Sequence, residues 1–135
     1  MRDTLFALHK SFGVTLFLLM VLRVLLRLRL GVPPLPEAIP AIERLFATLG
    51  HYALYLFMIV MPLSGFLMTN SVGFPVKLFG LQLPRLVGTD KDMAHFYDHV
   101  HEIAAYTLIL VITGHVAAVI WHRVKEKVNL LQRMI

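Results

Sequence analysis

HEIAAYTLILVITGH, residues 101 to 115, is the stretch that decides the fold. It begins and ends with histidine, and every residue between them except Glu102 is uncharged. In a helix, this spacing of fourteen residues spans roughly 21 Å and returns to within about 40° of the starting direction. His101 and His115 would therefore lie on one helix face at two depths of a membrane. This geometry suits two stacked metal cofactors, so we hypothesise electron transfer across a membrane.

The composition of the whole chain favours a membrane protein. Of the 135 residues, 58% are hydrophobic and 16% are charged, and the mean hydropathy is +0.73. These values lie outside the usual range of soluble domains. Three apolar blocks predict membrane-spanning helices near residues 4–30, 41–69 and 92–126, in a single all-α domain over residues 1–135. Because the chain has no cysteine, disulfides and thiolate-ligated metal sites are excluded.

The basic residues predict the orientation of these helices. One membrane face has Arg23, Arg27, Arg29, Arg44, Arg123, Lys125, Lys127 and Arg133, and the other has Arg2, Lys10, Lys77, Arg85 and Lys91. The richer face is expected to be cytoplasmic, which makes the N-terminus periplasmic and the C-terminus cytoplasmic. The charges lie beside helix ends and are not gathered with stacking aromatic residues. They therefore predict contact with anionic lipid and exclude nucleic-acid binding.

Four histidines match in depth as two pairs. Counted along their helices, His9 and His101 lie near the outer boundary, and His51 and His115 lie about 10 to 12 Å inside the cytoplasmic boundary. One imidazole on each of two facing helices, with small residues nearby, fits the ligation of haem b. A tetrahedral zinc site would instead need three or four ligands at one depth.

The predicted third helix also offers an alternative to haem ligation, a local metal site. His95, His99 and His101 could form a local metal cluster with Asp92 or Asp98. These histidines do not all share one helix face, which makes the cluster the less favoured interpretation.

His122 has two possible roles. It follows His115 by seven residues, about 10 Å nearer the cytoplasm on roughly the same face. Beside Trp121 and Arg123, it could bind the carbonyl of a quinone, or it could be part of an interfacial anchor.

Three runs of sequence resemble the second, third and fourth helices of the bacterial cytochrome b561 family. They are LHKSFGVTLFLLMVLRVLLRLRLGVPPLP (8–36), LGHYALYLFMIVMPLSGFLM (49–68) and HEIAAYTLILVITGHVAAVIWHR (101–123). The resemblance implies an inner-membrane protein whose three helices form most of a four-helix bundle holding two b haems. It also implies that His9 and His101 ligate the periplasmic haem iron and that His115 ligates the cytoplasmic one.

The second haem depends on a feature that this sequence lacks. The resemblance assigns the partner of His115 to a first helix with an HW motif, for which the chain has no counterpart. We therefore expect that the chain is part of a longer protein. Otherwise, the second haem would be five-coordinate, unbound or completed by another subunit. Depth alone nominates His51 as the replacement ligand, whereas the resemblance implies a role in the haem pocket or beside the propionates.

Three functions follow as hypotheses. The first is a haem b redox protein that passes electrons from a periplasmic donor to membrane quinone, with superoxide oxidation and ubiquinone reduction implied by the resemblance. The second is a cytochrome subunit that relays electrons for a dehydrogenase or hydrogenase, docking on the predicted surface loop at residues 70–90. The third is a haem-free membrane scaffold. A homodimer or a complex with a redox partner is compatible with either redox function.

Overall fold

A computed structural model describes residues 2–31 and 40–125 as three long helices and a small hairpin. Helix α1 spans Arg2–Leu30, α2 spans Ala41–Ser71 and α3 spans Lys91–Lys125. All three are long and apolar enough to cross a membrane, which confirms the predicted all-α membrane fold. The predicted bounds agree to within two residues, except that residue 126 lies outside the described ranges.

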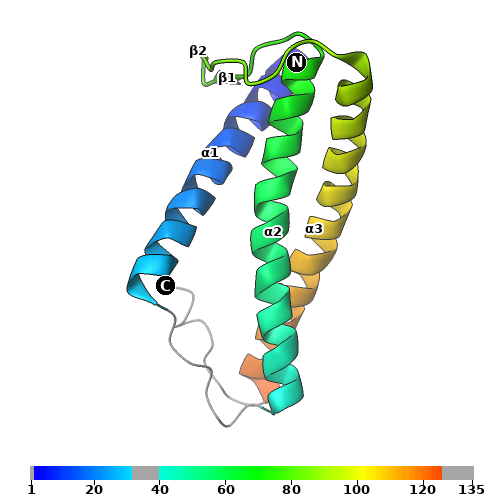
Figure 1. Ribbon diagram of the computed structural model, residues 1–135. Helices are drawn as coiled ribbons and strands as arrows, with labels where there is room; N and C mark the ends of the chain where they lie inside the picture. Colours follow the sequence, from blue (N-terminus) through cyan, green and yellow to red (C-terminus); the bar gives the residue numbers. More distant parts are fainter. Residues whose placement is uncertain (1, 32–39, 126–135) are drawn as a thin grey trace.

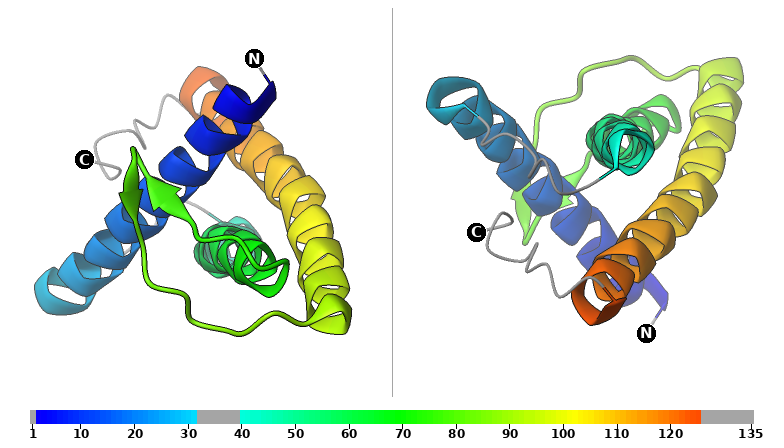
Figure 2. Two further views of the ribbon diagram at one scale, coloured as in Figure 1. Left: turned by 90° about the horizontal axis from the view of Figure 1, so that it is seen from above. Right: turned by 90° about the horizontal axis from the view of Figure 1, so that it is seen from below.

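Helix α2 lies between the other two helices (Figures 1 and 2). It packs extensively along α3, whereas α1 diverges from it toward Leu30 (Figure 1). In the described ranges, α1 and α3 bring no two Cα atoms within 8 Å of each other. Only side chains can therefore bridge the space between the α1 and α3 backbones.

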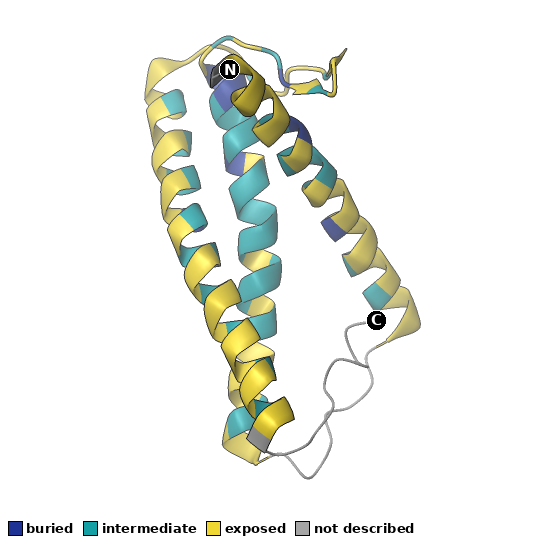
Figure 3. Ribbon diagram, turned by 180° about the vertical axis from the view of Figure 1, so that it is seen from behind, coloured by how far each residue is buried: buried dark blue, intermediate teal, exposed yellow. Residues whose placement is uncertain are grey.

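The outer surfaces of the helices are apolar, as contact with lipid requires. Among the described residues, the buried hydrophobic side chains are those of Met20, Val76 and Ala104. Large side chains such as Leu28 and Leu110 are instead 77% and 72% exposed. Figure 3 shows that α2 is the most enclosed helix, while α1 and α3 are mostly exposed. Burial of apolar surface from water within the chain is thus small, and the bilayer supplies the apolar surroundings.

Local sequence accounts for two of the helix ends. Gly31 has a φ of 74°, and its N–H donates to the Arg27 carbonyl at 3.0 Å, which is a left-handed cap at the end of α1. At the start of α3, the Asp90 carboxylate accepts from the N–H groups of Asp92 and Met93 at 2.9 and 3.0 Å. An acidic residue in this position satisfies amides that have no partner within the helix.

Residues 72–90 contain a hairpin that the sequence did not predict. Strand β1 (Lys77–Leu78) pairs antiparallel with β2 (Leu81–Gln82), with Lys77 opposite Gln82 and Leu78 opposite Leu81. The two-residue turn has φ values of 47° at Phe79 and 98° at Gly80. A positive φ is rare for phenylalanine, so tertiary contacts must stabilise this turn.

Ser11 of α1 provides those contacts. Its side chain is buried, and its hydroxyl accepts from the Phe79 N–H at 3.0 Å and donates to the Lys77 carbonyl at 3.1 Å. The rings of Phe12 and Phe79 also meet edge to face at 5.7 Å. The hairpin is therefore fixed on α1, two residues after His9.

Asn70 ties the rest of this segment to the end of α2. Its side chain is fully buried, and its amide oxygen accepts from the Leu86 N–H at 2.8 Å. The Arg85 guanidinium donates to the Asn70 carbonyl at 3.1 Å and to the Thr89 hydroxyl at 3.0 Å. The end of the bundle formed by the start of α1, the hairpin and the start of α3 is called the outer end below, and the opposite end is called the inner end (Figure 1).

Candidate functional site

His9 of α1 and His101 of α3 meet across the space between their helices. Their ring centres are 6.1 Å apart, and the ring planes are nearly perpendicular, at 87°. Because the α1 and α3 backbones stay apart, these two side chains form a bridge, called the outer pair. The sequence predicted this pairing from depth alone.

The spacing of the outer pair fits one metal ion between the rings. Two metal–nitrogen bonds of about 2.0 Å, with about 1.1 Å from each nitrogen to its ring centre, sum to about 6.2 Å. The observed separation is 6.1 Å. Iron held by an imidazole on each side is the ligation that b-type haem uses in four-helix bundles. The spacing of the two ring centres therefore fits the group.

The imidazole of His101 is held in one tautomer by α2. Its Nδ1 lies 2.7 Å from the Met61 carbonyl oxygen and 3.3 Å from the Ser64 hydroxyl. A carbonyl oxygen can only accept, so Nδ1 carries the proton and Nε2 keeps its lone pair for a metal. Metal-binding histidines characteristically donate their second N–H in this way.

Gly65 allows the His101 ring to lie against α2. A Cβ atom at this position would be 2.8 Å from Cε1 and 3.0 Å from Nδ1 of His101. Real Cβ atoms do not approach other atoms so closely, so any side chain here would displace the ring. The sequence MPLSG, residues 61 to 65, thus places the carbonyl, the hydroxyl and the free space that orient His101 within one turn of α2.

His51 of α2 and His115 of α3 form the second pair, called the inner pair. Their ring centres are 5.1 Å apart with an interplanar angle of 72°. This separation is about 1 Å shorter than two imidazoles around one metal ion require. The neighbouring Gly50 and Gly114 have open space where a Cβ would lie, with nothing within 4 Å. The two rings of the inner pair would have to separate slightly to hold a metal between them.

Arg27 and Tyr55 join α1 to α2 near the inner pair. The Arg27 guanidinium donates to the Tyr55 hydroxyl at 2.6 Å and lies 5.1 Å from the centre of its ring. Tyr55 is one turn beyond His51, so both are on the same face of α2. This contact fixes the diverging end of α1 relative to the helix that carries His51.

His122 lies near a residue that sequence reasoning missed. Its Nδ1 is 3.8 Å from Oε2 of Glu43, in the first turn of α2. The side chains of His122 and Glu43 are 17% and 38% exposed. The sequence did contain a signal for Glu43, because its carboxylate lies inside the predicted span at residues 41–69. Burial of a charged group in a membrane is energetically costly, so such a residue is a candidate for a functional role.

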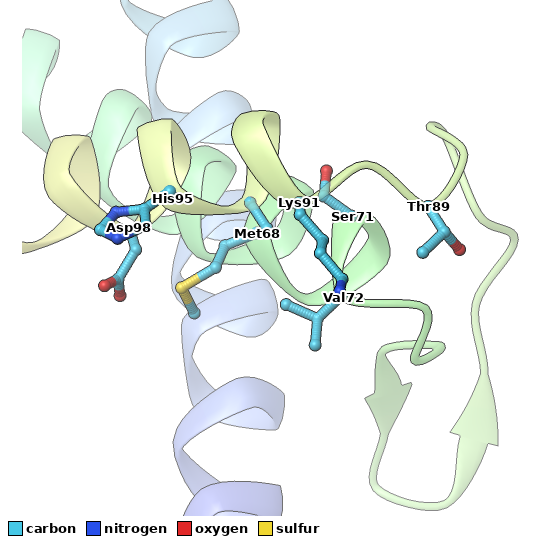
Figure 4. A pocket seen from close by; sticks show the side chains of 8 residues that line it. Met68, Ser71, Val72, Thr89, Lys91, His95 and Asp98 are labelled. Carbon is cyan, nitrogen blue, oxygen red and sulfur yellow. The ribbon is translucent and has the colours of Figure 1, made fainter.

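The structure does not favour the predicted cluster around His95. The rings of His95 and His99 stack on each other at 4.9 Å, while His101 faces His9. Over residues 2–31 and 40–125, no three His, Cys, Asp or Glu side chains form a group that could hold a metal ion. His95 instead lines a shallow pocket between the end of α2 and the start of α3, shown in Figure 4 with Ser71 and Asp98.

Comparison with known proteins agrees with this geometry. The family described as prokaryotic cytochrome b561 matches residues 1–135. The chain is 33% identical over 130 residues to cytochrome b561 homolog 2 of Escherichia coli K12, covering 95% of this chain and 69% of that protein. It is 33% identical over 128 residues to the probable superoxide oxidase CybB of Yersinia pestis, covering 94% and 72%. Cytochrome b561 homolog 1 of E. coli is 26% identical over 135 residues, covering 100% and 74%.

The family match spans the same three apolar helices that carry the paired histidines. It confirms the resemblance inferred from the sequence runs and makes a haem-free scaffold the least favoured of the three functions. It also accounts for the apolar helix surfaces, since the family is that of bacterial multi-pass membrane proteins. This chain belongs to the prokaryotic cytochrome b561 family, and it is a b-type haem protein of membrane electron transfer.

Proposed function

We propose that this chain has two haem sites, one on His9 and His101 and one on His115 with His51 as the facing imidazole. The observation that carries the proposal is the 6.1 Å separation of the ring centres in the outer pair, which matches the spacing of two imidazoles bound to one metal ion. The family supports b-type haem as the group. When bound, haem iron supplies a one-electron couple between the ferric and ferrous states.

The positions of the two pairs suit electron transfer across the membrane. His101 and His115 are separated by roughly 21 Å along α3, most of the thickness of a bilayer core. We assign the outer pair to the periplasmic side and the inner pair to the cytoplasmic side, because the inner end has more lysine and arginine. His101 is the residue most tightly oriented, through the Met61 carbonyl and Gly65.

The reaction that we propose is oxidation of superoxide at the outer end coupled to reduction of ubiquinone at the inner end. One of the relatives is named a probable superoxide oxidase, which supports this donor. Two superoxide ions lose one electron each and become dioxygen. One quinone gains the two electrons and two protons and becomes a quinol. The lipid-facing inner end, with His122 half-buried, suits a substrate dissolved in the bilayer.

The test uses the purified protein in lipid nanodiscs. A reduced-minus-oxidised spectrum should contain a b-type α band with two haems per chain. Superoxide generated in solution should then drive quinol formation. Absence of the α band would refute both redox functions, and one haem per chain would refute the two-site assignment.

A relay subunit is the second candidate, and the hairpin segment is the observation that favours it. Apolar side chains are exposed there beside the outer pair: Phe74 at 64%, Phe79 at 62%, Leu81 at 67% and Leu86 at 63%. An ordered apolar surface outside the spans is suited to docking of a redox partner. Protein with bound haem that forms no quinol with superoxide would favour this candidate over the first.

A further inference from the structure

We propose that Arg27 is a fixed positive charge between the two haem sites, held in place by Tyr55, and that it raises the midpoint potential of the inner haem. This inference rests on the two haem sites proposed above and names a residue that sets the potential of one of them. Arg27 belongs to the last turn of α1, the helix that supplies no ligand to the inner pair. Neither Arg27 nor Tyr55 is itself a proposed ligand.

The position of Tyr55 on α2 places the guanidinium between the two histidine pairs. Tyr55 follows His51 of the inner pair by about 6 Å along the helix axis. It precedes Met61 by about 9 Å, and the Met61 carbonyl oxygen lies 2.7 Å from Nδ1 of His101 in the outer pair. The Arg27 guanidinium is 2.6 Å from the Tyr55 hydroxyl. The charge is therefore at a level between the pairs and closer to the inner one.

The charge of Arg27 is not neutralised within the described part of the chain. Its guanidinium contacts Tyr55 in two ways, by donating to the hydroxyl at 2.6 Å and by lying 5.1 Å from the ring centre. Over residues 2–31 and 40–125, no carboxylate forms an ion pair with it. A phenol hydroxyl and an aromatic ring stabilise a cation but carry no net charge of their own. The full positive charge therefore acts on its surroundings.

The surrounding helices contain almost no other charge at this level. Helix α2 has no Asp, Glu, Lys or Arg after Arg44, and α3 has none between Glu102 and Arg123. On α1, Arg23 lies one turn from Arg27, but its side chain is exposed whereas that of Arg27 is half-buried. Apolar surroundings screen a charge much less than water does. The field of Arg27 therefore extends further than that of a cation on a wet surface.

The sign of the effect follows from the change in charge on reduction. Reduction of a ferric haem adds one negative charge, so a nearby positive charge favours the reduced form. At an effective dielectric constant of about 20, two unit charges about 10 Å apart change an equilibrium constant by about 10-fold or more. Because Arg27 is closer to the inner pair, it raises the inner potential more than the outer one. This difference favours electron transfer from the outer haem to the inner haem, the direction that the proposed function requires.

The test is a redox titration, followed by absorption in the α band, of the haem-loaded full chain in lipid nanodiscs. Arg27→Gln removes the charge but keeps a hydrogen-bond donor for Tyr55. It should shift the one-electron equilibrium of the inner haem toward the ferric form by about 10-fold, which corresponds to a midpoint potential lower by about 59 mV. The potential of the outer haem should fall by less. Haem content, measured by a pyridine haemochrome assay, should stay at the wild-type value.

Four further variants separate the charge from its support. Arg27→Lys keeps a positive charge and should recover most of the wild-type potential. Arg29→Gln makes the same change as Arg27→Gln at an exposed position two residues away, and it should leave the inner potential unchanged. Tyr55→Phe keeps the ring but removes the hydroxyl that holds the guanidinium, so the inner potential should fall by a smaller amount. Tyr52→Phe, at a side chain that is 69% exposed, is its matched control and should titrate like the wild type.

The outcomes separate this inference from the function on which it rests. Wild-type protein with a single haem would overturn the two proposed haem sites, and the role of Arg27 with them. Two haems in the wild type, with the same inner potential in Arg27→Gln, would overturn the role of Arg27 alone. An equal fall in Arg27→Lys and Arg27→Gln would do the same, because the effect would not follow the charge. If Arg27→Gln loses the inner haem, Tyr55→Phe decides, and an unchanged inner potential there would overturn the proposal.

Discussion

The outer and inner pairs use the same chemical groups in different surroundings. At the outer pair, α2 contributes no ligand but positions the His101 ring. It does so through the Met61 carbonyl, the Ser64 hydroxyl and the space left by the missing side chain at Gly65. At the inner pair, α2 itself supplies one ring, and the two rings are 1.0 Å closer together than those of the outer pair (6.1 less 5.1 Å). The outer pair is thus preorganised for a metal, whereas the inner pair must open to accept one.

The difference extends to the two ends of the bundle. The outer end has buried polar side chains, among them Ser11 and Asn70, that fasten the hairpin segment to α1 and α2. The inner end is joined across helices by Arg27 with Tyr55, and by Glu43 with His122. The many contacts at the outer end suit the retention of a haem. The polar pairs at the inner end, near lipid, suit the exchange of a substrate.

Removal of an outer ligand should have the largest effect. His101→Ala leaves His9 without an opposing imidazole, so we expect loss of the outer haem and a decrease of one haem per chain. A pyridine haemochrome assay on purified protein measures this. His99→Ala, an exposed histidine two residues away on the same helix, should keep the wild-type content. Unchanged haem content in His101→Ala would contradict the assignment of the outer pair.

The inner pair can be tested in the same way with His51→Ala. If His51 faces the inner haem as proposed, the variant should lose that haem and keep the outer one. Low-temperature spectra of the α band, which separate two b haems, provide the measurement. His95→Ala, stacked on His99 outside both pairs, is the matched control. Retention of both haems would show that His115 has a different partner.

Gly65→Ala should weaken the outer site without removing a ligand. The added Cβ would overlap the His101 ring, and overpacking of this kind costs about 1 to 3 kcal/mol. We expect the dissociation constant of the outer haem to rise by about 10-fold in a haem titration of the apoprotein. Gly88→Ala, at a position with open space around it, should have no such effect. Equal affinity in both variants would mean that the ring does not need this close approach.

Ser64→Ala should have the smallest effect, because it leaves both ligands, the Met61 carbonyl and the space at Gly65 intact. The Ser64 hydroxyl donates to the Met61 carbonyl at 2.8 Å and so shares that acceptor with His101. Without it, the carbonyl accepts more strongly from Nδ1–H and makes the imidazole more electron-rich. A change of about 0.5 kcal/mol corresponds to a midpoint potential lower by about 20 mV for the outer haem. Redox titration should find the inner potential unchanged, and an equal shift at both haems would contradict this local explanation.

Several features could be predicted from particular residues. The apolar blocks placed all three helices to within two residues, because the thickness of the bilayer sets the length of a span. The pairing of His9 with His101 and of His51 with His115 followed from counting residues, because an α-helix has a fixed rise. The hairpin was missed because its strands have two residues each and its turn contains Phe79 at positive φ.

By itself, the sequence predicted the three long helices and the position of each paired histidine along its helix, because hydropathy and helical rise are local properties. Only the tertiary structure decided the lateral contacts. These include the 6.1 and 5.1 Å separations, the Met61 carbonyl that fixes His101, and the approach of Glu43 to His122. Such contacts depend on how helices tilt and rotate against one another. Those angles result from packing between residues far apart in the chain, and no local pattern encodes them.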